Sequence, residues 1–169
     1  MNCFAEDLKY SHDCEVADCW REIYENAFPC MVAMIDHRED GWHQRSGVDR
    51  SVLMCNSKQI LVDEKSRRIK DTGDIMLEYV SNDNRGTPGW VEKSLMADYI
   101  AYAFMPSGTA YLLPVLQLQS AWAKNKDAWV AAYGTRAAKN ESYLTLNCPV
   151  PTNVLFPAIG SALRVEFSP

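Results

Sequence analysis

Two acids and a lysine, Asp49, Asp63 and Lys65, have the types and the spacing to carry chemistry. Apolar and β-branched residues follow Asp49 and precede Asp63, and polar turn residues at 56–58 separate the two runs. This pattern predicts two strands joined as a hairpin. Paired antiparallel, the strands would bring Asp49, at the start of the first, close to Asp63, at the end of the second. Because strand side chains alternate between faces, Asp63 and Lys65 should share one face, and Glu64 should take the other.

Two carboxylates beside a lysine suit a divalent cation. Mg²⁺ is a hard ion that proteins usually hold through one or two carboxylates and substrate phosphate, and Mn²⁺ can substitute for it. The bound ion lowers the pKa of a coordinated water and neutralises charge on a phosphoryl oxygen. A neighbouring ammonium can stabilise the charge that develops during attack. The pattern therefore predicts Asp49 and Asp63 as metal ligands and Lys65 as the cationic helper. Strand-end acids that cap turns, with a solvated lysine nearby, would give the same three letters.

The spacing D-x13-D-x-K from Asp49 to Lys65 resembles the core of the PD-(D/E)XK nuclease superfamily, although the first acid here stands in Gly-Val-Asp. The runs GVDR, VDEK, DIMLEYVS, PGW and DYIAYAF are similar to small phage and bacterial proteins assigned to that superfamily. The resemblance covers roughly residues 13–113. It implies a restriction-endonuclease-like αβββαβ core, with a central mixed sheet flanked by helices and additions at the C-terminal side. It also implies hydrolysis of DNA with Mg²⁺, leaving a 5′-phosphate.

Two glutamates are further candidates for the catalytic site. The first helix of the superfamily often supplies a glutamate to the metal, and Glu22 flanks the apolar stripe of the helix expected here. Glu78 stands among apolar neighbours in an expected third strand, where a buried carboxylate costs several kcal/mol unless it is paired or bound to metal. A surface glutamate at 22 and an edge-facing glutamate at 78 are the alternatives.

Four arginines near the two expected strands are candidates for contacts with a phosphate backbone. They are Arg45, Arg50, Arg67 and Arg68. An ordinary solvated face has the same appearance. The net charge of −5 argues against nucleic-acid binding by bulk electrostatics, so any basic contact surface must be local.

The composition, with 47% hydrophobic and 23% charged residues, is that of a soluble globular protein, and 169 residues predict one domain over 1–169. No apolar stretch has the length of a membrane span, and the first ten residues lack the apolar core of a signal peptide. These features predict a cytoplasmic protein without a membrane partner. The six cysteines include no C-x-x-C and are expected to be free thiols.

Hydrophobic periodicity predicts a mixed α/β fold. A polar loop is expected over 36–47, a polar connection over 134–142, and prolines 149 and 151 should end a strand. The expected helices are 12–28, 114–133 and 154–159, and the expected strands beyond the first hairpin are 75–81, 98–105, 109–113, 143–148 and 163–167.

The sequence thus favours a Mg²⁺-dependent nuclease acting on nucleic acid, with DNA as the expected partner and a homodimer as one way to cut both strands. The alternative is a non-catalytic module that binds nucleic acid or protein on the same fold, such as a phage counter-defence protein. An oligomeric structural protein is a third option.

Overall fold

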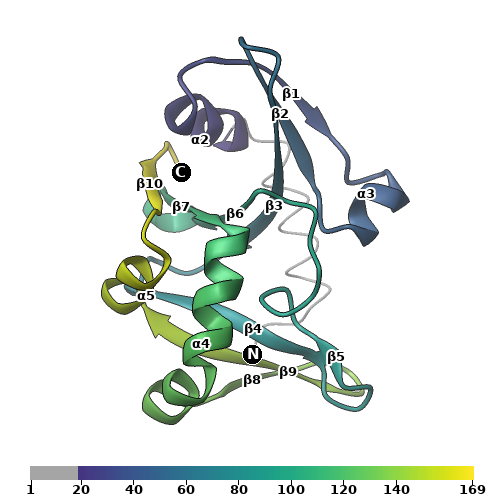
Figure 1. Ribbon diagram of the computed structural model, residues 1–169, viewed down its shortest axis with the longest axis vertical. Coiled ribbons are helices and arrows are strands. Elements are labelled where there is room, and N and C mark those ends of the chain that lie inside the picture. Colours follow the sequence, from purple (N-terminus) through teal and green to yellow (C-terminus); the bar gives the residue numbers. More distant parts are fainter. Residues whose placement is uncertain (1–18) are drawn as a thin grey trace. The chain divides into compact units, whose positions relative to one another are not determined.

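The computed structural model describes residues 19–169 and confirms a mixed α/β protein (Figure 1). By its contacts the described chain divides into two compact units. The six-stranded unit comprises 19–72, 95–115 and 161–169, and the four-stranded unit comprises 73–94 and 116–160. The single domain expected over 1–169 remains a prediction. Within residues 19–169, no helix combines the length and apolar character needed to cross a membrane.

The six-stranded unit is built on one mixed sheet with the order β1-β2-β3-β6-β7-β10. Its neighbours pair antiparallel except for β3 and β6, which run parallel. The expected hairpin is present as β2 and β3. The strands are β1 (Met31–Asp36), β2 (Arg50–Met54), β3 (Gln59–Arg67), β6 (Tyr99–Phe104), β7 (Thr109–Pro114) and β10 (Leu163–Glu166).

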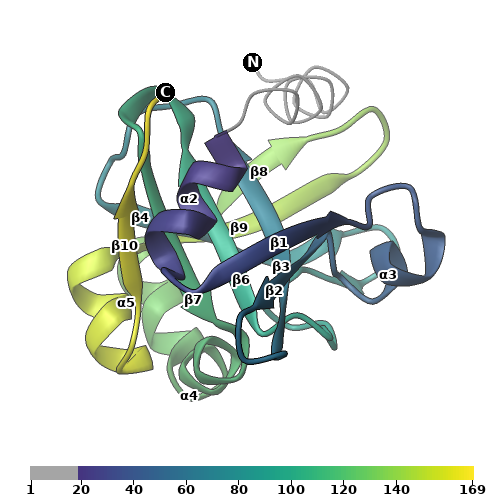
Figure 2. The ribbon, with the colours of Figure 1, turned by 90° about the horizontal axis from the view of Figure 1, so that it is seen from above.

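Helix α2 (Cys19–Ala27) covers one face of this sheet (Figure 2). Its buried side chains Trp20, Ile23 and Tyr24 join a core cluster with small and β-branched strand residues. The strand members of the cluster include Val52, Val62, Ala101, Ala103, Ala110, Leu112 and Val165. Burial of this apolar face is the main force that holds α2 on the sheet. The expected first half of the helix, 12–18, lies outside the described residues.

The register of the hairpin sets which side chains share a face. Arg50 pairs with Val62, so the next pair outward is Asp49 with Asp63. Val52 and Val62 belong to the core face under α2, and alternation therefore sends Asp49, Asp63 and Lys65 to the opposite face.

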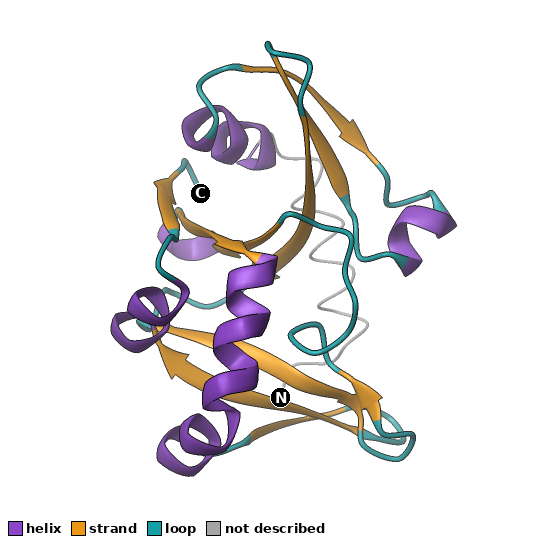
Figure 3. Cartoon of the chain, viewed as in Figure 1, coloured by secondary structure: helices purple, strands orange, loops and turns teal. Residues whose placement is uncertain are grey.

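The connection from β1 to β2 holds a short helix, α3 (Gly41–Arg45), where the sequence predicted only a loop (Figure 3). The Asp40 side chain caps it by accepting hydrogen bonds from the N–H groups of Trp42 and His43. The capping aspartate is thus the one sequence feature that marks this helix. Its five residues are too few to show the repeat of apolar residues by which a helix is predicted.

The four-stranded unit has a sheet with the order β5-β4-β9-β8, all antiparallel. Helix α4 packs on this unit's sheet through Trp122, whose ring lies 5.6 Å from that of Tyr79 on β4. The elements are β4 (Asp74–Asn82), β5 (Thr87–Pro88), α4 (Val115–Tyr133), β8 (Arg136–Lys139), β9 (Leu144–Pro151) and α5 (Thr152–Ile159).

The expected third strand, 75–81, is present as β4, which pairs in the four-stranded sheet. Two other sequence expectations about strands were wrong. The expected polar connection contains β8. Strand β9 continues through Pro149 and Pro151, because β8 pairs with it only up to Asn147. Beyond that point the side of β9 away from β4 has no neighbouring strand. A proline nitrogen that faces this side carries no N–H, but no hydrogen bond between strands is lost there.

In the six-stranded unit, α2 is followed by the three strands β1, β2 and β3, with the short helix α3 between β1 and β2. The strand that joins the β2–β3 hairpin to make three is thus β1 and not β4. Between β3 and β6 the chain, all of it described, carries β4 and β5 where the αβββαβ pattern expects a helix. The specific restriction-endonuclease-like core therefore remains a prediction.

Candidate active site

Asp49 is fixed by its backbone at the entry to β2. Its N–H donates to the carbonyl of Val62 at 2.9 Å, and its carbonyl accepts from the N–H of His37 at 2.8 Å. These two bonds continue the β2–β3 and β1–β2 ladders by one residue. The peptide of Asp49 is thus as firmly placed as a strand residue.

The structure brings the side chains of Asp49, Asp63 and Lys65 together. The two carboxyl groups lie within hydrogen-bond reach of each other, and the Lys65 ammonium forms an ion pair with Oδ1 of Asp63. The Glu64 peptide between them contributes at both ends. Its N–H donates to Oδ2 of Asp49 at 2.7 Å, and its carbonyl lies 3.5 Å from Nζ of Lys65. The Asp63 carboxylate and the Glu64 carbonyl therefore contact the Lys65 ammonium, whose charge also acts on Asp49.

The electrostatics of this trio follow from burial. The Asp63 side chain is 5% exposed, whereas the Lys65 side chain is 28% exposed and is the more accessible of the two. Burial, with the nearby charge of Asp63, raises the pKa of Asp49 to about 6 against the lowering effect of Lys65. Two neighbouring carboxylates such as those of Asp49 and Asp63 repel each other when both are ionised. A proton or a cation between them relieves that repulsion.

A second charged group lies on the opposite face of the hairpin, under α2. Nε of Arg50 and the hydroxyl of Tyr24 both lie 2.6 Å from Oε1 of Glu64. The side chains of Arg50 and Glu64 are each 5% exposed, and Asp36 lies 3.5 Å from Arg50. Burial raises the pKa of Glu64 to about 7, although Arg50 and Tyr24 lower it. Oε2 of Glu64 has no hydrogen-bond partner among the described residues.

Arg50 was a candidate for contact with substrate, but this ion pair holds it on the face opposite to the trio. Its guanidinium is buried on the other face and is bound to carboxylates. Strand and helix patterns do not indicate this pairing, because it depends on α2 packing over β2 and β3 with Tyr24 next to Glu64.

The other three arginines are differently placed. Arg67 extends the Asp63–Lys65 row along the same face of β3, and its Cζ lies 6.0 Å from the ring centre of Tyr102. Arg68 is half-buried and follows β3 directly, and Arg45 is the exposed last residue of α3. Arg67 is thus the substrate-contact candidate that shares the trio's face by register.

Glu22, one of the two candidate glutamates, does not join the trio. Glu22 lies on α2, on the opposite side of the sheet, and its carboxylate accepts from the N–H of Ser168 at 3.0 Å and from its hydroxyl at 3.2 Å. Glu78 lies on β4 in the four-stranded unit.

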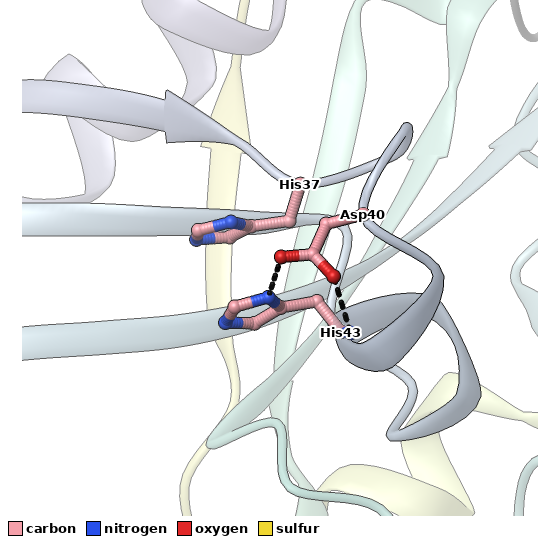
Figure 4. Close-up of side chains that lie close together, drawn as sticks. All are labelled: His37, Asp40 and His43. Carbon is pink, nitrogen blue, oxygen red and sulfur yellow. Dashed lines mark hydrogen bonds and ion pairs between the residues drawn. The ribbon is translucent and has the colours of Figure 1, made fainter.

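A second group of possible metal ligands was missed at the sequence level. His37, Asp40 and His43 each offer a ligand atom, and these atoms lie within 4.8 Å of one another (Figure 4). The regular spacing His-x-x-Asp-x-x-His was the available signal in the sequence. Burial, with the nearby His43, lowers the pKa of His37.

Comparisons of the chain with family models, with curated proteins and with solved structures give no match. The chemistry of the two groups therefore carries the functional argument.

Proposed function

We propose that this protein is a Mg²⁺-dependent nuclease that hydrolyses phosphodiester bonds, with DNA as its substrate. The observation that supports the proposal is the meeting of Asp49, Asp63 and Lys65 on one face of the β2–β3 hairpin. Two acids within hydrogen-bond reach, with an ammonium in contact, are the group that the sequence resemblance requires. Structural ion pairs also bury charge, but they do not need two like charges side by side.

The donor set fits Mg²⁺. The ion takes carboxylate oxygens, keeps several waters, and needs no dedicated protein cage. Asp49 and Asp63 would hold it, with the Glu64 carbonyl as a further oxygen nearby. When bound, the ion would activate water and neutralise charge on the phosphoryl group.

The chain's own residues would position and stabilise the reacting groups. The N–H of Glu64 holds Oδ2 of Asp49 and so fixes the orientation of that carboxylate. Lys65, the more exposed member of its ion pair with Asp63, supplies positive charge for the phosphoryl oxygens as negative charge develops. Arg67 follows Lys65 on the same face and would contact a neighbouring phosphate.

The proposal includes a cytoplasmic location, and a homodimer as the form that would cut both strands of a duplex. The thiols of Cys30, Cys55 and Cys148 are free, which is the usual state in a reducing compartment.

The test is metal-dependent cleavage of plasmid, linear and single-stranded DNA by the wild-type protein and by Asp63→Asn. Asparagine keeps the shape of the side chain but removes its charge, so we expect cleavage to fall at least about 100-fold. Asp127→Asn, at an exposed position of α4, is the matched control and should cleave as the wild type does.

Equal cleavage by the wild type and Asp63→Asn would contradict the proposal, because the activity would then come from elsewhere. DNA or protein binding without any cleavage would instead support the non-catalytic module.

A further inference from the structure

His37, Asp40 and His43 lie together at the point where β1 leads into α3. The two imidazole rings stack with their centres 3.9 Å apart and their planes 11° from parallel. Oδ2 of Asp40 lies 2.8 Å from Nδ1 of His43. Figure 4 shows the rings one above the other, with the Asp40 carboxylate beside them and ring nitrogens on corresponding sides.

Backbone hydrogen bonds hold all three positions. The N–H of Asp40 donates to the carbonyl of His37 at 2.9 Å, and the N–H of Val48 donates to the carbonyl of His43 at 3.0 Å. His37 is also tied to Asp49 by its own N–H. The three side chains therefore meet without any rearrangement of the chain.

We propose that His37, Asp40 and His43 form a binding site for a transition-metal dication such as Zn²⁺, separate from the Asp49–Asp63 site. Two imidazole nitrogens and one carboxylate oxygen suit Zn²⁺ and its first-row neighbours, whereas Mg²⁺ prefers an all-oxygen set. Three protein ligands leave a fourth position open to water or to an external ligand.

The surroundings of His37 are those of a metal-binding histidine. Its Nε2 lies 2.6 Å from Oγ of the buried Ser51, and that hydroxyl also accepts from the Gln59 side chain at 2.6 Å. Such a partner on one ring nitrogen orients the imidazole and leaves the other nitrogen for the metal. The three ligand atoms lie within 4.8 Å of one another, which is close to the separations that a metal at about 2.0–2.2 Å from each ligand requires.

Metal binding here would brace the connection that leads to Asp49. The loop from β1 to β2 is held at His37 and His43 by bonds to the peptides of Asp49 and Val48. A metal that joins both histidines to Asp40 would lock these supports together.

The test is a calorimetric titration of the metal-stripped full-length protein with Zn²⁺, in excess Mg²⁺. We expect one Zn²⁺ per chain at this site, and binding at least about tenfold weaker in Asp40→Asn. Asparagine caps a helix as well as aspartate does, so this variant keeps α3 but loses the anionic ligand. Glu39→Gln, an adjacent exposed acid outside the cluster, is the matched control and should bind as the wild type does.

His43→Ala gives the second measurement, because exposed thiols elsewhere also bind Zn²⁺. We expect this variant to lose the site, with X-ray absorption of the wild-type complex showing nitrogen and oxygen ligands. Unchanged Zn²⁺ binding in His43→Ala, a sulfur-ligand spectrum, or no binding by the wild type would each overturn the proposal. Asp63→Asn should bind Zn²⁺ normally, so this result and the cleavage result are independent.

Discussion

At the scale of single residues, Asp49 is a carboxyl group in an environment that disfavours its charge. It is largely buried beside another acid, and its pKa of about 6 lies above the ordinary value of 3.8. Between these two pH values the folded protein holds a proton that the unfolded chain has released. The contribution of Asp49 to the free energy of unfolding therefore decreases as pH rises from about 4 to about 6.

Asp49→Asn should therefore make the protein more stable at pH 8 and flatten its pH dependence between pH 4 and 6. The gap between about 6 and 3.8, at about 1.4 kcal/mol per pH unit, limits the gain to about 3 kcal/mol. Asparagine can still accept from the N–H of Glu64, so the local structure should persist. Urea denaturation of both proteins at pH 5 and pH 8 measures the effect. A loss of stability at pH 8 would show that the ionised carboxylate is favourable.

The trio could be predicted from sequence because its geometry is local. A hairpin with a short turn fixes the register, and alternation then places residues 49, 63 and 65 on one face. The Arg50–Glu64 pair could not be predicted, since nothing in the strand pattern says that α2 buries that face with a tyrosine hydroxyl over the carboxylate. Glu22 was misplaced for the same reason, because its partner Ser168 is 146 residues away.

At the scale of secondary-structure elements, the Arg50–Glu64 pair ties β2 to β3, and Tyr24 adds α2 to the same group. Arg50→Leu would leave a buried carboxylate without its main counter-charge, and we expect a loss of about 3–5 kcal/mol. The double variant Arg50→Leu/Glu64→Leu should recover most of this loss, because a buried apolar pair replaces a buried ion pair at little net change. Denaturant unfolding of the three proteins measures both values. A double variant as unstable as the single one would contradict the argument.

The turn before β2 depends on Gly47. Its φ of +68° lies in the left-handed region, and a Cβ there would clash with Cδ2 of Leu95. Gly47→Ala should destabilise the protein by about 2–3 kcal/mol, from backbone strain plus overpacking. Gly86 has φ +60° and open space around it, so Gly86→Ala should lose only about 1 kcal/mol. Equal losses in the two variants, measured by denaturant unfolding, would rule out the contact with Leu95.

Elements with strong periodicity were predictable, and those that depend on tertiary context were not. The β2–β3 and β6–β7 hairpins and α4 lie where the patterns place them. Strand β8 was missed because all four of its residues are exposed, so they show no apolar alternation. Its extended conformation depends on pairing with β9. The prolines of β9 misled because the sequence does not show which side of a strand lacks a neighbour.

At the scale of the whole molecule, the net charge of −5 limits how the protein can meet nucleic acid. In the described part of the chain, Lys65, Arg67 and Arg68 form a local basic row in or next to β3, near the candidate site. Contacts to about three phosphates would give a slope of about −3 in a plot of log affinity against log salt concentration.

We expect Arg67→Gln to reduce that slope by about 1. The measurement is fluorescence anisotropy with labelled duplex DNA, in an Asp63→Asn background so that the DNA stays intact. Arg136→Gln, on the exposed strand β8, is the matched control and should leave the slope unchanged. A slope steeper than about −6 would point to a broad basic surface that this acidic chain does not predict.

Segments of the two compact units alternate along the sequence. Strands β3 and β6 are neighbours in one sheet, yet residues 73–94, which join them in sequence, belong to the other unit. Neither unit can therefore be excised by truncation at one point or transplanted as a contiguous cassette. A protease nick in the exposed 83–87 segment would leave a fragment pair that still has to reassociate to complete both sheets.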